Sequence, residues 1–278
     1  MIQFVSKLES QFSSILVIDN NSSNYNDFNK ELNFLRENSK TRFLKNSLNI
    51  GLASAQNQGA KYAVDNFFQA FCIFDQDSDI ELDFLDVLLD DYNLLISKDV
   101  AVGAIGPSVV DRSSGISYPI AIYDGIFLKR HMLKEGEIAE CSYIISSGSL
   151  ISTQVWMQVG TFLDILFINY IDIEWCFRSS SKGFKVYTSN NTKIIQQVGL
   201  YRKSVFGRSI PVHNPIRRYY AARNSVFMLF LPHMSIGYKF REIFFNPMRL
   251  IFDCILEGNV RHRVYYFIKG VYDGIRHV

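Results

Sequence analysis

Two short apolar runs that end abruptly in acidic, polar segments constrain the fold more than any other feature. Residues 14–18 run into Asp19-Asn20-Asn21-Ser22-Ser23, and residues 70–74 run into Asp75-Gln76-Asp77-Ser78. Continuous apolar runs of this length are typical of strands that are buried on both faces, as in a parallel sheet. We therefore expect two parallel strands, each followed by a polar loop.

Segments with helical spacing separate these runs. Apolar residues recur at helical intervals over residues 27–38 and 54–68, and residues 41–45 fit a short strand between them. Strands that alternate with helices predict βαβ units, and hence an α/β fold with a mostly parallel mixed sheet flanked by helices. Open sheets of this kind bind ligands outside the carboxyl ends of their strands, where both acidic loops fall.

The charge is polarised along the chain, although the net formal charge is only +2 and suggests no nucleic-acid partner. Residues 201–278 carry 13 Lys and Arg against 4 Asp and Glu, whereas the rest carries 16 against 23. We expect a catalytic domain over residues 1–200 and a basic, aromatic-rich helical extension over residues 201–278. The extension suits anionic lipid head groups or a diphosphate, and equally suits solvated helices.

Cysteine usage and the amino end indicate the compartment. Cys72, Cys141, Cys176 and Cys254 are far apart and show no spacing typical of a zinc site or a disulfide framework. The chain opens without a leader-like pattern, and no apolar run approaches the ~20 residues that span a bilayer. We expect a cytoplasmic protein with peripheral contact at the inner face of the cell membrane.

The Asp75-Gln76-Asp77 triplet is a candidate metal site. Its two carboxylates lie two residues apart just after a strand, and hard oxygen ligands suit Mg²⁺ or Mn²⁺. A solvated turn has the same composition, so the triplet gains weight only from its context.

That context is an ordered series of six short motifs. In sequence order they are Asp19-Asn20-Asn21-Ser22, Asn49-Ile50-Gly51-Leu52-Ala53 with Gln56-Asn57-Gln58-Gly59, Asp75-Gln76-Asp77-Ser78, Ser146-Ser147-Gly148-Ser149, Asp172-Ile173-Glu174-Trp175-Cys176-Phe177-Arg178, and Arg217-Arg218-Tyr219-Tyr220 with Arg223-Asn224. Over nearly the whole chain, this set and its spacing resemble the rhamnosyltransferase branch of glycosyltransferase family 2.

The resemblance implies a GT-A fold and an inverting enzyme that takes a sugar from a nucleoside-diphosphate donor, dTDP-L-rhamnose. The implied acceptor is a lipid-linked saccharide in bacterial surface polysaccharide synthesis (O-antigen or capsule). Asp172 matches the general base, while Asp75 and Asp77 match the site of the diphosphate and its Mg²⁺ or Mn²⁺ ion. The implied donor-binding residues are Asp19, Asn20, Asn49, Gly51, Asn57 and Asp75, and the implied acceptor or pocket residues are Ser147, Gly148, Glu174, Trp175, Arg217 and Arg218.

Several of these residues have a structural alternative. Asp172 also fits a helix cap, Gly51 fits an ordinary turn, and residues 146–148 fit a tight turn. Glu174 shares a face with Asp172 only in an extended segment and would point elsewhere in a helix, so it is either an acceptor-side residue or a structural one. The arginines at 217, 218 and 223 fit pyrophosphate binding and cation–aromatic packing equally well.

The chain departs from the family pattern in three places. Family members begin with a strand ahead of the helix that matches residues 1–12, so we expect the first strand of the fold to be missing here. Gln196 stands where many relatives carry a metal-binding His, and Asn169 stands where relatives often carry Asp. These departures support an alternative in which the chain is an inactive, truncated member that binds a nucleotide or a partner.

Overall fold

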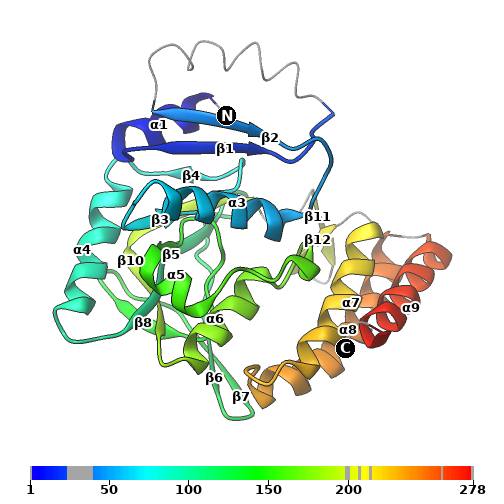
Figure 1. Cartoon of the computed structure of the whole chain (residues 1–278). Coiled ribbons are helices and arrows are strands. Elements are labelled where there is room, and N and C mark those ends of the chain that lie inside the picture. The colour runs from blue at the N-terminus through cyan, green and yellow to red at the C-terminus, as the bar shows by residue number, and fades with distance from the viewer. Residues whose placement is uncertain are drawn as a thin grey trace.

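A computed structural model describes residues 2–23, 40–197, 201–205, 208–212, 215–257 and 259–276 (Figure 1). The helix expected over residues 27–38 lies outside these described residues. The protein has a mixed α/β fold with a central sheet flanked by helices and a helical carboxyl-terminal part, which confirms the expected α/β class. The expectation of a mostly parallel sheet is wrong for the central sheet, because most of the strand pairs in its described residues are antiparallel.

The amino-terminal part contains a helix, two strands and a second helix. These are α1 (Ile2–Gln11), β1 (Ile15–Asp19), β2 (Thr41–Lys45) and α3 (Leu52–Asp65). β1 and β2 run parallel and form a two-stranded sheet, with Ile15 opposite Thr41 and Asp19 opposite Lys45. Both expected strands are therefore present, and the polar loops begin where they were expected, at the carboxyl ends of β1 and β3.

A six-stranded sheet forms the centre of the molecule. Its order is β3-β9-β5-β10-β4, and β8 also pairs with β10. The strands are β3 (Ala70–Cys72), β4 (Asp79–Ile80), β5 (Val102–Asp111), β8 (Ile138–Cys141), β9 (Leu150–Ser152) and β10 (Lys185–Gln196). β5 and β10 are parallel, whereas β4, β8 and β9 run antiparallel to their neighbours. Residues 70–74 thus supply a strand of this sheet, followed by the acidic loop.

Successive residues of the central strands enter two different hydrophobic clusters. On β5, Ala104 belongs to one cluster and Ile105 to the other, and Val186 and Tyr187 divide in the same way on β10. This alternation follows from the pleat, which points neighbouring side chains to opposite faces. The central sheet is therefore buried on both faces at β5 and β10. The two strands expected from the apolar runs, β1 and β3, are mostly half-buried.

Helices cover both faces. One cluster contains Phe84 and Leu88 of α4 (Phe84–Ile96), together with Val5 and Leu8 of α1. The other contains residues of α3, α5 (Thr153–Val159) and α6 (Ile171–Ser181), including the fully buried Trp175. This three-layer arrangement brings the amino end of α6 to the carboxyl edge of the sheet.

The carboxyl-terminal part begins with a hairpin and continues as three helices. The elements are β11 (Tyr201–Val205), β12 (Arg208–Val212), α7 (Pro215–Phe230), α8 (Ile236–Glu257) and α9 (Val260–Arg276); a further hairpin, β6 (Ile120–Asp124) and β7 (Phe127–His131), lies earlier in the chain. The helices gather at one side of the molecule (Figure 1). Within the described ranges, no helix is both long enough and apolar enough to cross a bilayer.

Candidate active site

The acidic loop after β3 is held by a buried serine of another segment. The Oγ of Ser147 accepts a hydrogen bond from the Asp75 amide at 3.1 Å and lies 2.7 Å from the Oγ of Ser78. Ser147 is almost fully buried, so the loop over residues 146–149 fixes the backbone that carries Asp75. Gly148 next to it has φ +78°, and a Cβ there would lie 2.8 Å from Pro107. This close packing requires glycine.

The surroundings of Asp75 shift the pKa of its carboxyl group in both directions. Burial raises its pKa and the neighbouring Asp77 raises it further, while the amide of Gln196 and the charge of Arg217 lower it. Gln196 Nε2 lies 3.4 Å from Asp75 Oδ2 and donates to Ser78 Oγ at 2.9 Å. Gln196, which stands where many relatives carry a metal-binding His, therefore lies at the acidic loop. Helix α7 places Arg217 where its charge acts on the same Asp75 carboxylate.

Asp172 occupies the first turn of α6. Its Oδ1 accepts a hydrogen bond from the Ile173 amide at 2.9 Å, and its Oδ2 accepts one from the Ser146 amide at 3.2 Å. Burial raises the pKa of Asp172 to about 6, these backbone donors oppose the shift, and the charge of Asp75 adds to it. A carboxylate with a pKa near neutrality is suited to accept a proton at physiological pH.

The segment that leads into α6 has an unusual backbone. Phe167, Asn169 and Tyr170 all have positive φ, between 60° and 67°. Such conformations cost free energy in residues other than glycine, and they persist where surrounding contacts enforce them. Asn169 therefore stands in a left-handed backbone position, which Asn tolerates better than most residues.

Helix α7 supplies the contacts that enforce this backbone. The side-chain amide of Asn224 is almost fully buried and donates to the carbonyls of Leu166, Ile168 and Asn169 at 2.7, 2.8 and 3.3 Å. The ring of Tyr220 stacks on Phe167, with centroids 4.7 Å apart. The carboxyl-terminal helices thus hold the segment that positions Asp172, a role that spacing along the chain did not predict.

Comparison with known proteins identifies the family. A curated protein, dTDP-rhamnosyl transferase RfbF of Shigella flexneri, is 30% identical over 280 residues, which cover 98% of this chain and 89% of the relative. The chain belongs to the rhamnosyltransferase branch of glycosyltransferase family 2. It is accordingly a glycosyltransferase, as the ordered motifs predicted. No family model matches it.

Two solved structures resemble this glycosyltransferase in fold. The crystal structure of GalNAc-T7 with UDP, GalNAc and Mn²⁺ has a TM-score of 0.53 at 16% identity, covering 95% of this chain and 52% of that one. The crystal structure of TarS from S. aureus has a TM-score of 0.57 at 12% identity, covering 100% and 46%. The chain spans about half the length of these proteins, and the similarity supports the GT-A fold.

The residues expected at the nucleotide form a polar network at the carboxyl end of β1. Asn20 Oδ1 accepts from the Ile50 amide at 3.1 Å, and Asn20 Nδ2 donates to Asn49 Oδ1 at 3.0 Å. Asn49 Oδ1 also accepts from the Gly51 amide at 3.0 Å. The Asp19 carboxylate accepts from the Ser22 amide. These contacts join the loop after β1 to the loop before α3.

Gly51 and Asn57 have tightly defined local environments. Gly51 has φ +89°, and a Cβ there would lie 2.5 Å from the ring of Phe167. Asn57 donates to the Phe162 carbonyl and to Asp164, and it accepts from the Phe162 amide at 2.9 Å. The amide of Asn57 thus binds the segment that follows α5. Its expected role at the nucleotide stays a prediction.

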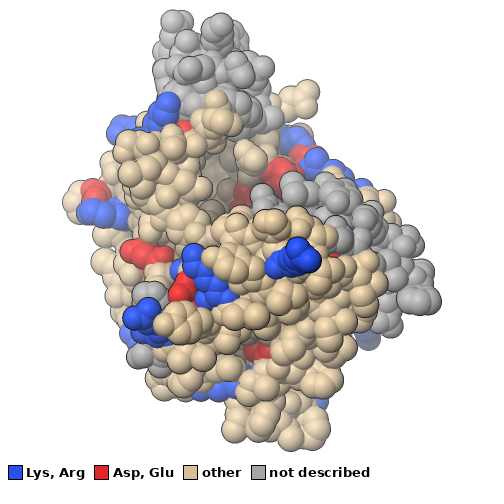
Figure 2. Space-filling model, turned by 90° about the vertical axis from the view of Figure 1, so that its right-hand side faces the viewer, with Lys and Arg blue, Asp and Glu red and all other residues tan. Residues whose placement is uncertain are grey.

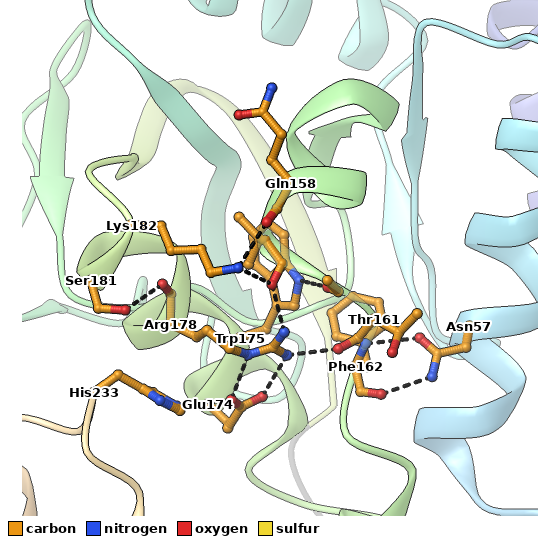
Figure 3. A network of polar contacts seen from close by, with 12 residues as sticks. Asn57, Gln158, Thr161, Phe162, Glu174, Trp175, Arg178, Ser181, Lys182 and His233 are labelled. Carbon is orange, nitrogen blue, oxygen red and sulfur yellow. Dashed lines mark hydrogen bonds and ion pairs between the residues drawn. The ribbon is translucent and has the colours of Figure 1, made fainter.

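Glu174 and Trp175 lie inside the protein (Figure 3). Glu174 is fully buried and accepts from Arg178 at 2.8 and 3.0 Å, while a ring nitrogen of His233 lies 2.9 Å from its Oε1. The indole of Trp175 donates to the Gly160 carbonyl. Because α6 is helical here, Glu174 and Asp172 lie on different faces, and the contacts of Glu174 are structural.

The three arginines of α7 have different surroundings. Arg218 is buried and forms an ion pair with Asp253 of α8. Arg223 lies over the ring of Tyr220, 5.0 Å from its centroid, and donates to the Ile165 carbonyl. Arg217 is the arginine whose charge acts on Asp75. Of the three, Arg217 is therefore the best placed for a diphosphate.

Proposed function

We propose that this glycosyltransferase transfers L-rhamnose from dTDP-L-rhamnose to a hydroxyl of a lipid-linked saccharide, with inversion at the anomeric carbon. The proximity of the Asp172 carboxylate to the acidic loop that carries Asp75 carries the proposal, and the name of the Shigella relative supports the donor. The pathway that we infer is surface polysaccharide synthesis at the cytoplasmic face of the membrane.

In the proposed reaction, the acceptor hydroxyl attacks the anomeric carbon from the face opposite the diphosphate. Its proton passes to the Asp172 carboxylate as the new glycosidic bond forms. The bond between the anomeric carbon and the diphosphate oxygen breaks, and dTDP leaves with the electron pair. Arg217 is suited to stabilise the charge that develops on the diphosphate.

The residues of the acidic loop fit a divalent cation. Asp75 and Asp77 offer carboxylate oxygens and Gln196 an amide oxygen if its side chain turns over, while phosphate oxygens and water would complete the coordination. The charge of Asp77 raises the pKa of Asp75, and a cation between the two carboxylates would stabilise both in the ionised form. We infer Mg²⁺ or Mn²⁺, which would stabilise charge on the leaving diphosphate. The Mn²⁺ in the GalNAc-T7 structure is consistent with this chemistry in the fold.

The carboxyl-terminal helices present an apolar surface that fits a membrane-bound acceptor. Figure 2 shows a broad face over these helices with few charged residues. On α9 the exposed apolar side chains recur at helical spacing along one face: Tyr265, Ile268, Tyr272 and Ile275. Arg261 and Lys269 add positive charge on the same helix. We infer that α8 and α9 lie against anionic lipid.

The experiment that tests the reaction is donor binding and turnover by wild type and Asp172→Asn. We expect both proteins to bind dTDP-L-rhamnose with similar Kd in calorimetry, and the variant to lose at least a hundredfold in kcat. Unchanged turnover would remove Asp172 as the base. Binding of another nucleotide sugar in preference to dTDP-L-rhamnose would contradict the donor, and binding of none would favour the inactive alternative.

A vesicle flotation assay tests the membrane contact. Wild type should float with anionic vesicles at low salt, and Ile268→Glu should not, because a charge interrupts the apolar face. Phe67→Glu is a matched control, since Phe67 is 93% exposed and lies outside the carboxyl-terminal helices. Equal flotation of all three proteins, or of none, would contradict the proposal.

A further inference from the structure

A buried carboxylate of α8 joins three elements next to the catalytic segment. Glu242 is 2% exposed, and its Oε2 accepts hydrogen bonds from the hydroxyl of Tyr170 at 2.8 Å and from that of Ser225 at 3.1 Å. Arg249, further along α8, donates to both carboxylate oxygens at 2.9 Å. The Glu242 carboxylate therefore connects the residue that precedes α6 with helices α7 and α8.

Helix α8 buries polar side chains and exposes apolar ones. Glu242 and Asn246 are 2% and 5% exposed, whereas Phe240, Ile243 and Phe244 are 57–62% exposed. Burial of apolar surface stabilises a fold, but burial of a charge is unfavourable unless the charge is paired and hydrogen-bonded. Apolar burial therefore does not account for a carboxylate at position 242, and its hydrogen-bond partners do.

The partners of Glu242 keep it ionised. Burial by itself would raise the pKa of Glu242, but hydrogen bonds from Arg249, Tyr170 and Ser225 and the charge of Arg249 bring that pKa below its usual value. The Tyr170 hydroxyl stays protonated, because burial and the charge of Glu242 raise its pKa. An ionised acceptor and a protonated donor form a charge-assisted hydrogen bond, which is stronger than a neutral one. The contact between Tyr170 and Glu242 is of this strong kind.

The backbone of Tyr170 requires an anchor of this strength. Tyr170 has φ +65° and ψ −1° and is the residue that precedes α6. A left-handed conformation is unfavourable for a bulky side chain, and it persists where surrounding contacts enforce it. The guanidinium of Arg249 also donates to the Tyr170 hydroxyl at 3.0 Å, so this hydroxyl is bonded to both members of the ion pair. The pair thus fixes the far end of the Tyr170 side chain.

The position of Tyr170 determines where α6 begins. The Tyr170 carbonyl accepts a hydrogen bond from the Glu174 amide at 2.8 Å, which closes the first turn of the helix. Asp172 lies inside that turn, and its carboxylate is held by the amides of Ile173 and Ser146 at 2.9 and 3.2 Å. A shift of Tyr170 therefore moves Asp172 relative to Ser146 and the acidic loop.

We propose that Glu242 is a positioning residue for the catalytic base. Together with Arg249 it anchors the Tyr170 hydroxyl, and it thereby holds the first turn of α6 in the geometry that places Asp172 for proton transfer. The inference rests on the proposed role of Asp172 as the base. Misplacement of a reacting group by about 1 Å can lower a rate about a hundredfold, so a loosened anchor should affect turnover. Glu242 acts through Tyr170 and not as an acid or a base itself.

Removal of one hydroxyl tests the anchor. Tyr170→Phe breaks the contacts to Glu242 and Arg249 and keeps the ring, which packs in the same apolar cluster as Phe177 and Tyr238. We expect kcat to fall about tenfold or more, while the Kd for dTDP-L-rhamnose stays within about threefold of wild type. Tyr238→Phe is the matched control, since the Tyr238 hydroxyl has no hydrogen-bond partner among the described residues. Equal kcat in wild type and both variants would overturn the proposal.

A double-mutant cycle tests whether Tyr170 and Glu242 act through one pathway. Glu242→Gln keeps the shape of the side chain and removes its charge, so we expect it to lower kcat as Tyr170→Phe does. The double variant should lose little more than the more severe single variant, because the effects of residues that act as a unit are not additive. Effects on kcat that multiply would overturn the proposal. If Glu242→Gln does not fold, the comparison of Tyr170→Phe with Tyr238→Phe decides alone.

Hydrogen exchange separates this proposal from the assignment of the base. The Glu174 amide, which closes the first turn of α6, should exchange about tenfold faster in Tyr170→Phe and at the wild-type rate in Tyr238→Phe. Faster exchange together with a lower kcat supports the positioning role. Unchanged exchange overturns the proposal, whatever the activity of Asp172→Asn. Faster exchange with unchanged kcat also overturns it, and turnover that survives in Asp172→Asn would then show that the base itself was wrongly assigned.

Discussion

The side-chain amide of Gln196 lies 3.4 Å from Oδ2 of Asp75, at the end of β10 and the start of the acidic loop. This contact places a residue from the last strand of the central sheet beside a carboxylate more than a hundred positions earlier. A side chain at position 196 that binds metal more strongly should therefore lower the metal concentration that the enzyme needs for turnover.

We expect Gln196→His to strengthen the dependence on Mn²⁺. An imidazole nitrogen is a better ligand for Mn²⁺ than an amide oxygen, so the concentration of Mn²⁺ giving half-maximal turnover should fall about tenfold. Titration of activity with Mn²⁺ and Mg²⁺ measures the change. Gln196→Ala is the control, and equal metal dependence in all three proteins would exclude position 196 from the site.

The pKa of Asp172 sets the acid limit of activity. The base works only when ionised, and burial together with the charge of Asp75 raises its pKa to about 6. We expect kcat to be level above pH 7 and to fall about tenfold per pH unit below pH 6. A pH–rate profile at saturating donor and acceptor measures this decrease in kcat at acid pH. A constant kcat down to pH 5 would contradict the role of Asp172 as the base.

Asp172→Asn should stabilise the fold near neutral pH while it abolishes turnover. The folded pKa of Asp172 lies above that of the unfolded chain, so stability is lost as pH rises from about 4 through 6 and stays lower above that range. A shift in pKa from 3.8 to about 6 corresponds to about 3 kcal/mol, and the gain in stability stays below this figure because Asn keeps only some of the hydrogen bonds of the carboxylate. Urea unfolding at pH 8 and at pH 3.5 should show the gain at pH 8 alone.

Asn224→Ala should impair both stability and catalysis. The change frees three backbone carbonyls in the segment that precedes α6, which costs about 2–3 kcal/mol in the free energy of unfolding. Because that segment positions Asp172, kcat should fall at least tenfold in protein that is still folded. Asn66→Ala removes an exposed amide contact and should leave both quantities nearly unchanged.

Glu174→Gln should act on stability and leave the chemistry of folded protein intact. The substitution removes the negative charge that pairs with Arg178, although the amide oxygen of Gln can still accept a hydrogen bond from the guanidinium. Breaking a buried ion pair costs up to about 3–5 kcal/mol. We expect a lower Tm, with KM for the acceptor within about threefold of wild type at low temperature. A raised KM without loss of Tm would instead support the acceptor role implied by the motif. Asp65→Asn, in an exposed pair with Lys61, is the stability control.

The sequence by itself determined the local elements and the family. The apolar runs before Asp19 and Asp75 predicted β1 and β3, because short continuous apolar runs that end in polar loops are typical of strands in a parallel sheet. The ordered motifs predicted the glycosyltransferase assignment, which the Shigella relative confirms. The strands and the motifs are both set by residues close together in the chain, and a single sequence shows such short-range patterns directly.

Only the tertiary structure decided which motif residues meet. Asp172 and Glu174 are two positions apart, yet the helix directs one toward Asp75 and the other into a buried pair with Arg178. The adjacent arginines of α7 also have different partners: the charge of Arg217 acts on Asp75, whereas Arg218 forms an ion pair with Asp253. Asn224 supports the catalytic segment from a distant helix. Such contacts depend on how helices pack across the sheet, which periodicity along one segment does not encode.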